Sequence, residues 1–147
     1  MSLKSGERVV VVGCGPVGMV LTLALYRKGI PVTLLERADG PIEDQRAAAI
    51  QPSSLEMLKE LGVTDEVHER GLISPTFHYR DRVSGELVAE FDFSTLADMT
   101  EFPYVIQYEQ FKLVETIIAE IGETPDVEYR FSSEVTGIEQ HGDGATV

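Results

Sequence analysis

Three glycines near the amino terminus have the spacing of a loop that binds phosphate groups. Gly13, Gly15 and Gly18 form the pattern G-x-G-x-x-G, with Pro16 and Val17 between the last two. In such loops the first glycine permits a tight turn, the second lets a pyrophosphate approach the backbone, and the third allows close packing of helix on strand. The free N–H groups of the following helix favour anions. The pattern predicts a dinucleotide-binding loop, with a purely structural turn as the alternative.

A carboxylate follows near the distance that dinucleotide-binding folds require. Glu36 comes about 20 residues after the glycines. Its carboxylate could accept hydrogen bonds from both ribose hydroxyls and would repel a 2′-phosphate, so the bound dinucleotide should not be NADP. A solvated acid at a strand end is the alternative, and Arg37 is interpreted as an exposed base near the adenosine. These features fit NAD and FAD equally well.

The elements around these residues are predicted to form a β-α-β unit. Residues 8–12, rich in valine, are expected as a strand buried on both faces of a parallel sheet. Pro16 suits the first turn of a helix and Gly29 ends it, before a second strand at 32–36. The helical crossover makes the two strands parallel neighbours. The expected apolar face of the helix consists of Val17, Val20, Leu21, Ala24 and Leu25.

The middle of the chain changes character. Ser53 and Glu56 predict a capping box that opens a short helix over 54–61, with a second helix over 64–70. Two strands, at 76–81 and 86–93, are expected to form a hairpin. Its aromatic residues are interpreted as the core of a small sheet; they are Phe77, Tyr79, Phe91 and Phe93.

The last third of the chain returns to alternating strands and helices. A short strand at 104–107 precedes a helix over 109–121, which is followed by strands at 127–131 and 135–140. A returning strand would begin at residue 145, directly before the end of the sequence. Its partner would lose its ladder there, so we expect the chain to be a fragment.

Composition and charge narrow the range of partners. The 147 residues, 43% hydrophobic and 25% charged, are typical of one globular domain. A net charge of −13 disfavours nucleic acid and anionic membranes as partners. The single cysteine, Cys14, cannot form an internal disulfide, and the three histidines lack the spacing of metal ligands. We therefore expect a cytoplasmic protein without a metal site or a membrane span.

The segment after Glu36 favours FAD over NAD. A typical nicotinamide domain would continue with a helix and a third parallel strand, whereas here a polar loop leads to Arg46-Ala47. With this loop the chain resembles the FAD-dependent aromatic hydroxylases of the p-hydroxybenzoate hydroxylase type, and among them the 3-(3-hydroxyphenyl)propionate and phenol hydroxylases. The matching segments are residues 9–18, Leu35-Glu36-Arg37, Arg46-Ala47, residues 55–62 and Gln107-Tyr108-Glu109-Gln110.

The resemblance implies a fold and a domain organisation. The fold is α/β, a glutathione-reductase-like FAD/NAD(P)-binding domain of Rossmann type with a parallel sheet and an antiparallel excursion. Residues 1–75 and 104–147 would form an incomplete FAD-binding domain, and 76–103 would belong to the substrate-side sheet. Two family segments that contact the pyrophosphate and the flavin ribose lie beyond the sequence, so the 147 residues alone are expected to be inactive.

The resemblance also implies a function for the parent protein. It would hydroxylate a small phenolic or aromatic substrate, with FAD bound and NADH or NADPH as the reductant. Arg46 would lie along the flavin pyrophosphate, and Gln107 would hydrogen-bond the cofactor near its ribityl and phosphate region. No catalytic residue is assigned.

Two other functions and one oligomeric state remain open. The chain could be the dinucleotide-binding domain of an NAD-dependent dehydrogenase, or a non-catalytic nucleotide-binding fragment. An unpaired strand edge at the end of the chain favours self-association, so a homodimer is one expectation.

Overall fold

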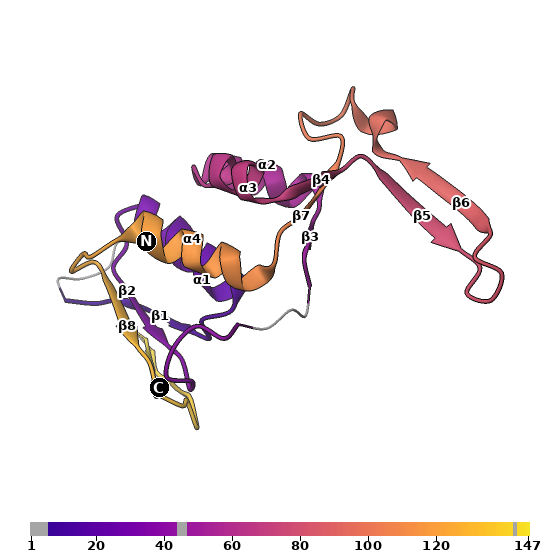
Figure 1. Ribbon diagram of the computed structural model, residues 1–147. Coiled ribbons are helices and arrows are strands. Elements are labelled where there is room, and N and C mark those ends of the chain that lie inside the picture. The colour runs from indigo at the N-terminus through magenta and orange to yellow at the C-terminus, as the bar shows by residue number, and fades with distance from the viewer. Residues whose placement is uncertain (1–5, 44–46, 143) are drawn as a thin grey trace. The chain divides into compact units, whose positions relative to one another are not determined.

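The chain folds into two compact units. The computed structural model describes residues 6–43, 47–142 and 144–147 (Figure 1). Unit 1 consists of Met1–Asp44 and Val114–Val147, and unit 2 consists of Gln45–Leu113. The boundary between the units falls within helix α4 (Gln110–Ile121).

A parallel three-stranded sheet organises unit 1. Its strands are β1 (Val9–Val12), β2 (Val32–Leu35) and β8 (Val127–Arg130), in the order β1-β2-β8. Helix α1 (Pro16–Arg27) connects β1 to β2, and the chain turns after it at Gly29, whose φ is 67°. The predicted β-α-β unit and parallel sheet are therefore confirmed.

The two faces of this sheet differ. Val11 of β1 is aligned with Leu34 of β2 and Tyr129 of β8; Val11 and Leu34 are buried, and helix α1 contacts both of their strands. The opposite face carries Val12, which is 54% exposed. The expectation that the first strand is buried on both faces is thus wrong: Val11 is buried, but Val10 and Val12, on the other face, are 39% and 54% exposed.

Helix α1 packs with a different face from the one expected. Its buried residues are Met19, Thr22 and Leu23, whereas Val17 and Leu21 of the expected face are exposed. The helix is apolar almost all round, so the spacing of apolar residues could not choose between faces. Close packing at the small residue Gly18 made the choice, and Thr22, one turn later, is buried with its hydroxyl donating to the Gly18 carbonyl at 2.8 Å.

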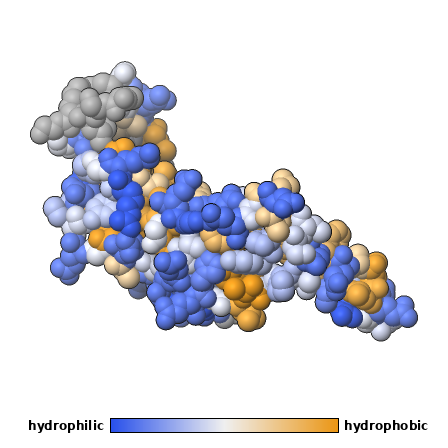
Figure 2. Space-filling model, turned by 90° about the horizontal axis from the view of Figure 1, so that it is seen from above, coloured by the Kyte–Doolittle hydropathy of each residue, from blue (hydrophilic) through white to orange (hydrophobic). Residues whose placement is uncertain are grey.

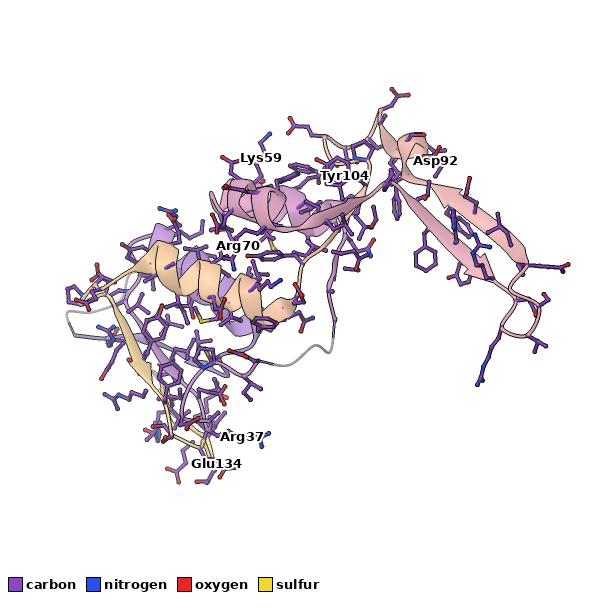
Figure 3. All side chains as sticks on the ribbon, in the orientation of Figure 1. Arg37, Lys59, Arg70, Asp92, Tyr104 and Glu134 are labelled. Atoms are coloured by element: carbon purple, nitrogen blue, oxygen red, sulfur yellow. The ribbon has the colours of Figure 1, made fainter. Side chains whose placement is uncertain are left out.

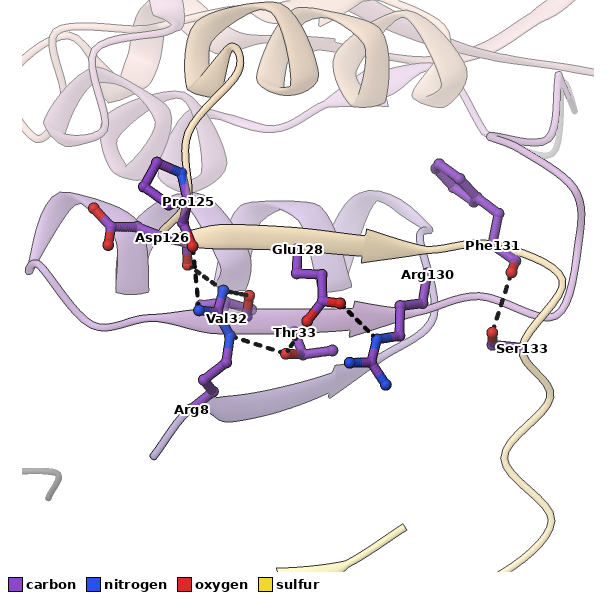
Figure 4. Close-up of polar contacts among 9 residues, drawn as sticks. All are labelled: Arg8, Val32, Thr33, Pro125, Asp126, Glu128, Arg130, Phe131 and Ser133. Atoms are coloured by element: carbon purple, nitrogen blue, oxygen red, sulfur yellow. Dashed lines mark hydrogen bonds and ion pairs between the residues drawn. The ribbon is translucent and has the colours of Figure 1, made fainter. Parts of the chain in front are cut away.

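Arg8 fixes the amino ends of the strands. Its guanidinium donates to the hydroxyl of Thr33 at 3.0 Å and to the carbonyls of Val32 and Asp126 at 2.7 and 2.8 Å (Figure 4). A further bond of 3.2 Å reaches the carbonyl of Pro125. One planar fork of donors therefore contacts the starts of both β2 and β8 and helps to hold their register.

The remaining elements of unit 1 follow the predicted order. Helix α4 buries Val114, Ile117 and Ile121. The predicted strand over 135–140 is reduced to β9 (Glu139–Gln140), which pairs antiparallel with β10 (Ala145–Thr146).

Unit 2 contains a small antiparallel sheet of order β3-β7-β4 and two helices. The first helix begins two residues earlier than expected, with Gln51 as its N-cap and Pro52 at its first position. Proline is favoured at that position, so Ser53 lies inside the helix and the predicted capping box is wrong. The elements are β3 (Ala49–Ile50), α2 (Pro52–Glu60), α3 (Thr64–Arg70), β4 (Leu72–Ser74) and β7 (Val105–Gln107).

The rest of unit 2 is a two-stranded hairpin followed by a short 3-10 helix, η1 (Phe93–Leu96). Strands β5 (Thr76–Arg80) and β6 (Leu87–Asp92) pair antiparallel, as predicted. The aromatic side chains do not form a core, because Phe77, Tyr79 and Phe91 are 50%, 55% and 54% exposed. Hydrophobic residues are visible on the surface of this hairpin, at the right of Figure 2.

Candidate functional site

Three loops meet at the carboxyl ends of the parallel strands in unit 1. They follow β1, β2 and β8 and consist of residues 13–15, 36–38 and 131–133. Arg37 and Glu134 lie at this end of the sheet (Figure 3). In open α/β sheets, ligands bind outside the carboxyl ends of the strands, and the predicted glycine loop and Glu36 both lie here.

The glycine turn has the backbone geometry that its sequence predicted. Gly13 has a φ of 100°, in the left-handed region that favours glycine, and its N–H donates to the Leu35 carbonyl at 2.8 Å. A Cβ atom on Gly18 would lie 2.0 Å from the carbonyl oxygen of Gly13. The first and third glycines are thus required by the fold itself.

The second glycine has a different role. Gly15 is the N-cap of α1 with φ −75° and ψ 175°, which any residue can adopt, and a Cβ there would meet no atom within 4 Å. The start of α1 has Pro16 at its first position, no side-chain cap and no acidic residue in its first turn, and Val17 is 82% exposed. Among the described residues, this helix end thus has no side-chain cap and leaves room beside Gly15, and its N–H groups carry the partial positive charge of the helix.

The carboxylate of Glu36 lies against the glycine loop. It accepts a hydrogen bond from the backbone N–H of Cys14 at 2.7 Å and another from that of Ala38 at 3.0 Å. Partial burial acts to raise the pKa of Glu36, but the N–H donors of Ala38, Cys14 and Arg37 and the charge of Arg37 outweigh it and lower this pKa. Glu36 therefore stays ionised and retains acceptor capacity, because each carboxylate oxygen can accept more than one hydrogen bond.

Two further groups at this site are buried. Burial, together with the nearby charge of Glu36, raises the pKa of the Cys14 thiol to about 11, so this thiol is not a nucleophile. Burial and the proximity of Cys14 raise the pKa of Tyr129 to about 12. The Tyr129 hydroxyl is buried and has no hydrogen-bond partner among the described residues.

The loop after β8 was not anticipated as part of the site. The N–H groups of Ser132 and Ser133 donate to the carbonyls of Ala38 and Glu36 at 2.7 and 2.8 Å, and Ser132 has a φ of 52°. A non-glycine residue in this conformation is uncommon. Its position was implicit in the sequence, because a third strand parallel to the first two must end at the same edge of the sheet.

Gln107 belongs to unit 2. It ends β7, is exposed, and is aligned with Ala49 of β3 and Leu72 of β4. The segment before β3 contacts the start of α4: Tyr108 N–H donates to the Ala48 carbonyl at 2.7 Å, and Gln110 N–H donates to the Ala47 carbonyl at 3.3 Å. The structure thus brings Ala47 next to the family segment at 107–110, whereas the predicted ligand Arg46 lies outside the described residues.

The histidines of the described residues have separate roles. His68 contacts the carbonyl of Thr64 through Nδ1 and the hydroxyl of Tyr104 through Nε2, both at 2.8 Å. His78 pairs with Glu90 across the hairpin. No cluster of three or more potential metal ligands, and no helix long and apolar enough to cross a membrane, occurs in the described ranges.

Comparison with known proteins identifies the family. Residues 7–147 match the family described as FAD binding domain. The chain is 34% identical over 138 residues to the para-nitrophenol 4-monooxygenase of Pseudomonas sp. (strain WBC-3), which covers 94% of this chain and 34% of that protein. It is 36% identical over 139 residues to the 6-hydroxy-3-succinoylpyridine 3-monooxygenase of Pseudomonas putida, covering 95% of this chain and 35% of that protein.

A solved structure supports the same assignment. The crystal structure of p-nitrophenol 4-monooxygenase from Pseudomonas putida DLL-E4 superposes with a TM-score of 0.86 at 33% identity, covering 95% of this chain and 38% of that one. The chain thus spans about a third of the length of these relatives. The predicted resemblance and fold class are confirmed: the chain belongs to the FAD binding domain family, shared with flavin-dependent aromatic monooxygenases.

Proposed function

We propose that the site at the carboxyl ends of β1, β2 and β8 binds the ADP half of FAD, and that the full protein is an aromatic monooxygenase. The main support for this proposal comes from the start of α1. It has no acidic residue in its first turn, a side chain on Gly15 would meet no described atom within 4 Å, and the ionised Glu36 contacts the adjoining Cys14 N–H. A helix start of this kind would bind a pyrophosphate, and the carboxylate beside it would bind a ribose.

Each of the proposed site residues would contact a different part of the dinucleotide. Gly13, Gly15 and Gly18, with Pro16 and Val17, would bring the backbone of the loop against the pyrophosphate. Glu36 would accept hydrogen bonds from the ribose hydroxyls, and its charge would repel a 2′-phosphate. Arg37, exposed at the end of β2, would lie near the adenosine.

The family resemblance supplies two further ligands. Arg46 would neutralise charge on the pyrophosphate, and Gln107 would hydrogen-bond the ribityl and phosphate region. Bound FAD would supply the redox chemistry, with NADH or NADPH as reductant and O₂ as co-substrate. The chain's own contribution is to bind and orient this cofactor.

The substrate and the organisation of the full protein are part of the proposal. A small aromatic compound is favoured as substrate because the relatives named above act on p-nitrophenol and on a hydroxypyridine. Residues 1–75 and 104–147 would serve the cofactor, whereas 76–103 would join the substrate-side sheet. We further propose a cytoplasmic location, a homodimer, and no nucleic-acid or membrane partner.

An FAD titration of the protein, followed by flavin fluorescence with NAD as competitor, tests the cofactor. Saturable binding that NAD does not displace is expected. Displacement by NAD would instead support a dehydrogenase domain, and binding of neither would contradict a site that the 147 residues can form alone. For the activity, NAD(P)H oxidation by the full-length protein should depend on both FAD and a phenolic compound.

A further inference from the structure

The side chain of Glu36 connects two of the three loops at the site. Its Oε2 accepts the N–H of Cys14 in the glycine loop at 2.7 Å, and its Oε1 accepts the N–H of Ala38 in the following loop at 3.0 Å. The Cys14 side chain is only 4% exposed. The carboxylate of Glu36 thus accepts a hydrogen bond from the N–H of Cys14, which lies in a partly buried turn.

The backbone of the same residue contacts the third loop. The Glu36 N–H donates to the carbonyl of Arg130 at 2.9 Å, and the Glu36 carbonyl accepts the N–H of Ser133 at 2.8 Å. The neighbouring Ala38 carbonyl accepts the N–H of Ser132, whose backbone is held at a φ of 52°. A conformation that costs energy persists only where its surroundings impose it, so these bonds define the loop after β8.

We propose that Glu36 is a positioning residue for the glycine loop as well as a ribose ligand, so that one carboxylate sets the geometry of both the pyrophosphate and the ribose contacts. The contact with the ribose depends on the function proposed above. The contact between Glu36 and the glycine loop is formed within the protein and needs no ligand.

The charge of Glu36 suits this role. Hydrogen bonds to an ionised acceptor are shorter and stronger than those between neutral groups. A neutral glutamine could still accept from one of the two N–H groups through its carbonyl. Its amide NH₂ would then face the other N–H, and one of the two loops would lose its contact.

Hydrogen exchange of single backbone amides, measured by NMR on the protein without added nucleotide, tests the proposal. In the wild type the Cys14 and Ala38 amides should be protected. In Glu36→Gln at least one of them should exchange about tenfold faster or more, as expected for loss of a charge-assisted hydrogen bond. The amides within β2 should keep their wild-type exchange rates, which separates a local change from general destabilisation.

Glu128→Gln is the matched control. Glu128 lies on β8 and accepts from Arg130 and Thr33 on the face of the sheet away from the glycine loop. Its substitution removes the same charge from the same sheet and should leave the Cys14 and Ala38 amides unchanged.

Two results would overturn the proposal. One is a wild-type Cys14 amide that exchanges as fast as an unstructured one, which can be observed even if Glu36→Gln fails to fold. The other is equal protection of both amides in the wild type and in Glu36→Gln. Because no FAD is added, a failure of FAD binding in the separate titration would contradict the proposed function and leave this result unaffected.

Discussion

The strand-end loops of unit 1 and the β5–β6 hairpin of unit 2 are both exposed, but they are stabilised in different ways. In the loops, backbone groups are paired with one another and with Glu36. In the hairpin, the apolar face consists of half-exposed rings that contact mainly one another, with Tyr79 edge-on to Phe77 and to Phe91.

This difference shows which kind of local structure one unit can stabilise by itself. Polar groups at the ends of strands can be oriented by hydrogen bonds within a small sheet, so a site for a polar ligand can be preformed there. Apolar rings gain stability only when another layer removes them from water, and a two-stranded hairpin is marginal by itself. The strand-end loops are therefore held by contacts within their own unit, whereas the rings of the hairpin remain exposed among the described residues.

Replacing Gly15 gives the largest expected effect on binding. In Gly15→Val the added side chain enters the open space at the start of α1, where the pyrophosphate is proposed to lie. FAD affinity should fall about 100-fold or more, the cost of a severe steric conflict. The free energy of unfolding should change by less than about 1 kcal/mol, because the backbone conformation suits any residue. Parallel FAD titration and urea denaturation measure both quantities.

Gly18→Ala, in contrast to Gly15→Val, should mainly reduce the stability of the fold. Its Cβ would lie 2.0 Å from the Gly13 carbonyl oxygen, so helix and turn must separate. We expect a loss of about 1–3 kcal/mol in the free energy of unfolding, typical of overpacking. Urea denaturation monitored by circular dichroism measures it. If Gly18→Ala were as stable as the wild type, the close packing of α1 on the glycine turn would be wrong.

Acid should remove the contribution that Glu36 makes to the stability of the loops. The pKa of Glu36 is lowered in the folded protein, since its N–H donors and Arg37 outweigh partial burial, so its contribution is fully present above its ordinary pKa. That contribution disappears as pH falls from the ordinary value through the lowered one. The difference in unfolding free energy between wild type and Glu36→Gln should be less than about 1 kcal/mol at neutral pH, because Glu36 is partly solvated. A pH series of urea denaturations should show it approaching zero in acid; a constant difference would contradict the carboxylate contacts.

A substitution in the hairpin should have the smallest effect. Phe91→Thr removes a ring that is 54% exposed and keeps a residue that favours strands. The expected loss of stability in this chain is about 0.5 kcal/mol or less, as for other surface positions. A loss as large as that of Gly18→Ala, measured in the same denaturation experiment, would show that the hairpin is as well packed as the loops and would break the comparison.

Much of the fold could be predicted because local rules decide it. Gly13 and Gly29 have positive φ where turns were expected, and the helix over 64–70 has the predicted bounds. In α2, local rules conflicted, and proline at the first helical position prevailed over a serine cap. The expected roles of Arg46 and Gln107 stay predictions that follow from the family resemblance.

The sequence by itself determined the β-α-β unit, the glycine turn and the presence of an acid at the end of the second strand, because each depends on neighbouring residues or on fixed spacing. Only the tertiary structure decided which face of α1 is buried, that the hairpin rings stay exposed, and that Ser132 and Ser133 donate to the carbonyls of Ala38 and Glu36. These outcomes depend on which segments, distant in sequence, pack together. Spacing along one element shows that a face is apolar, but only its neighbours in space determine whether that face is covered.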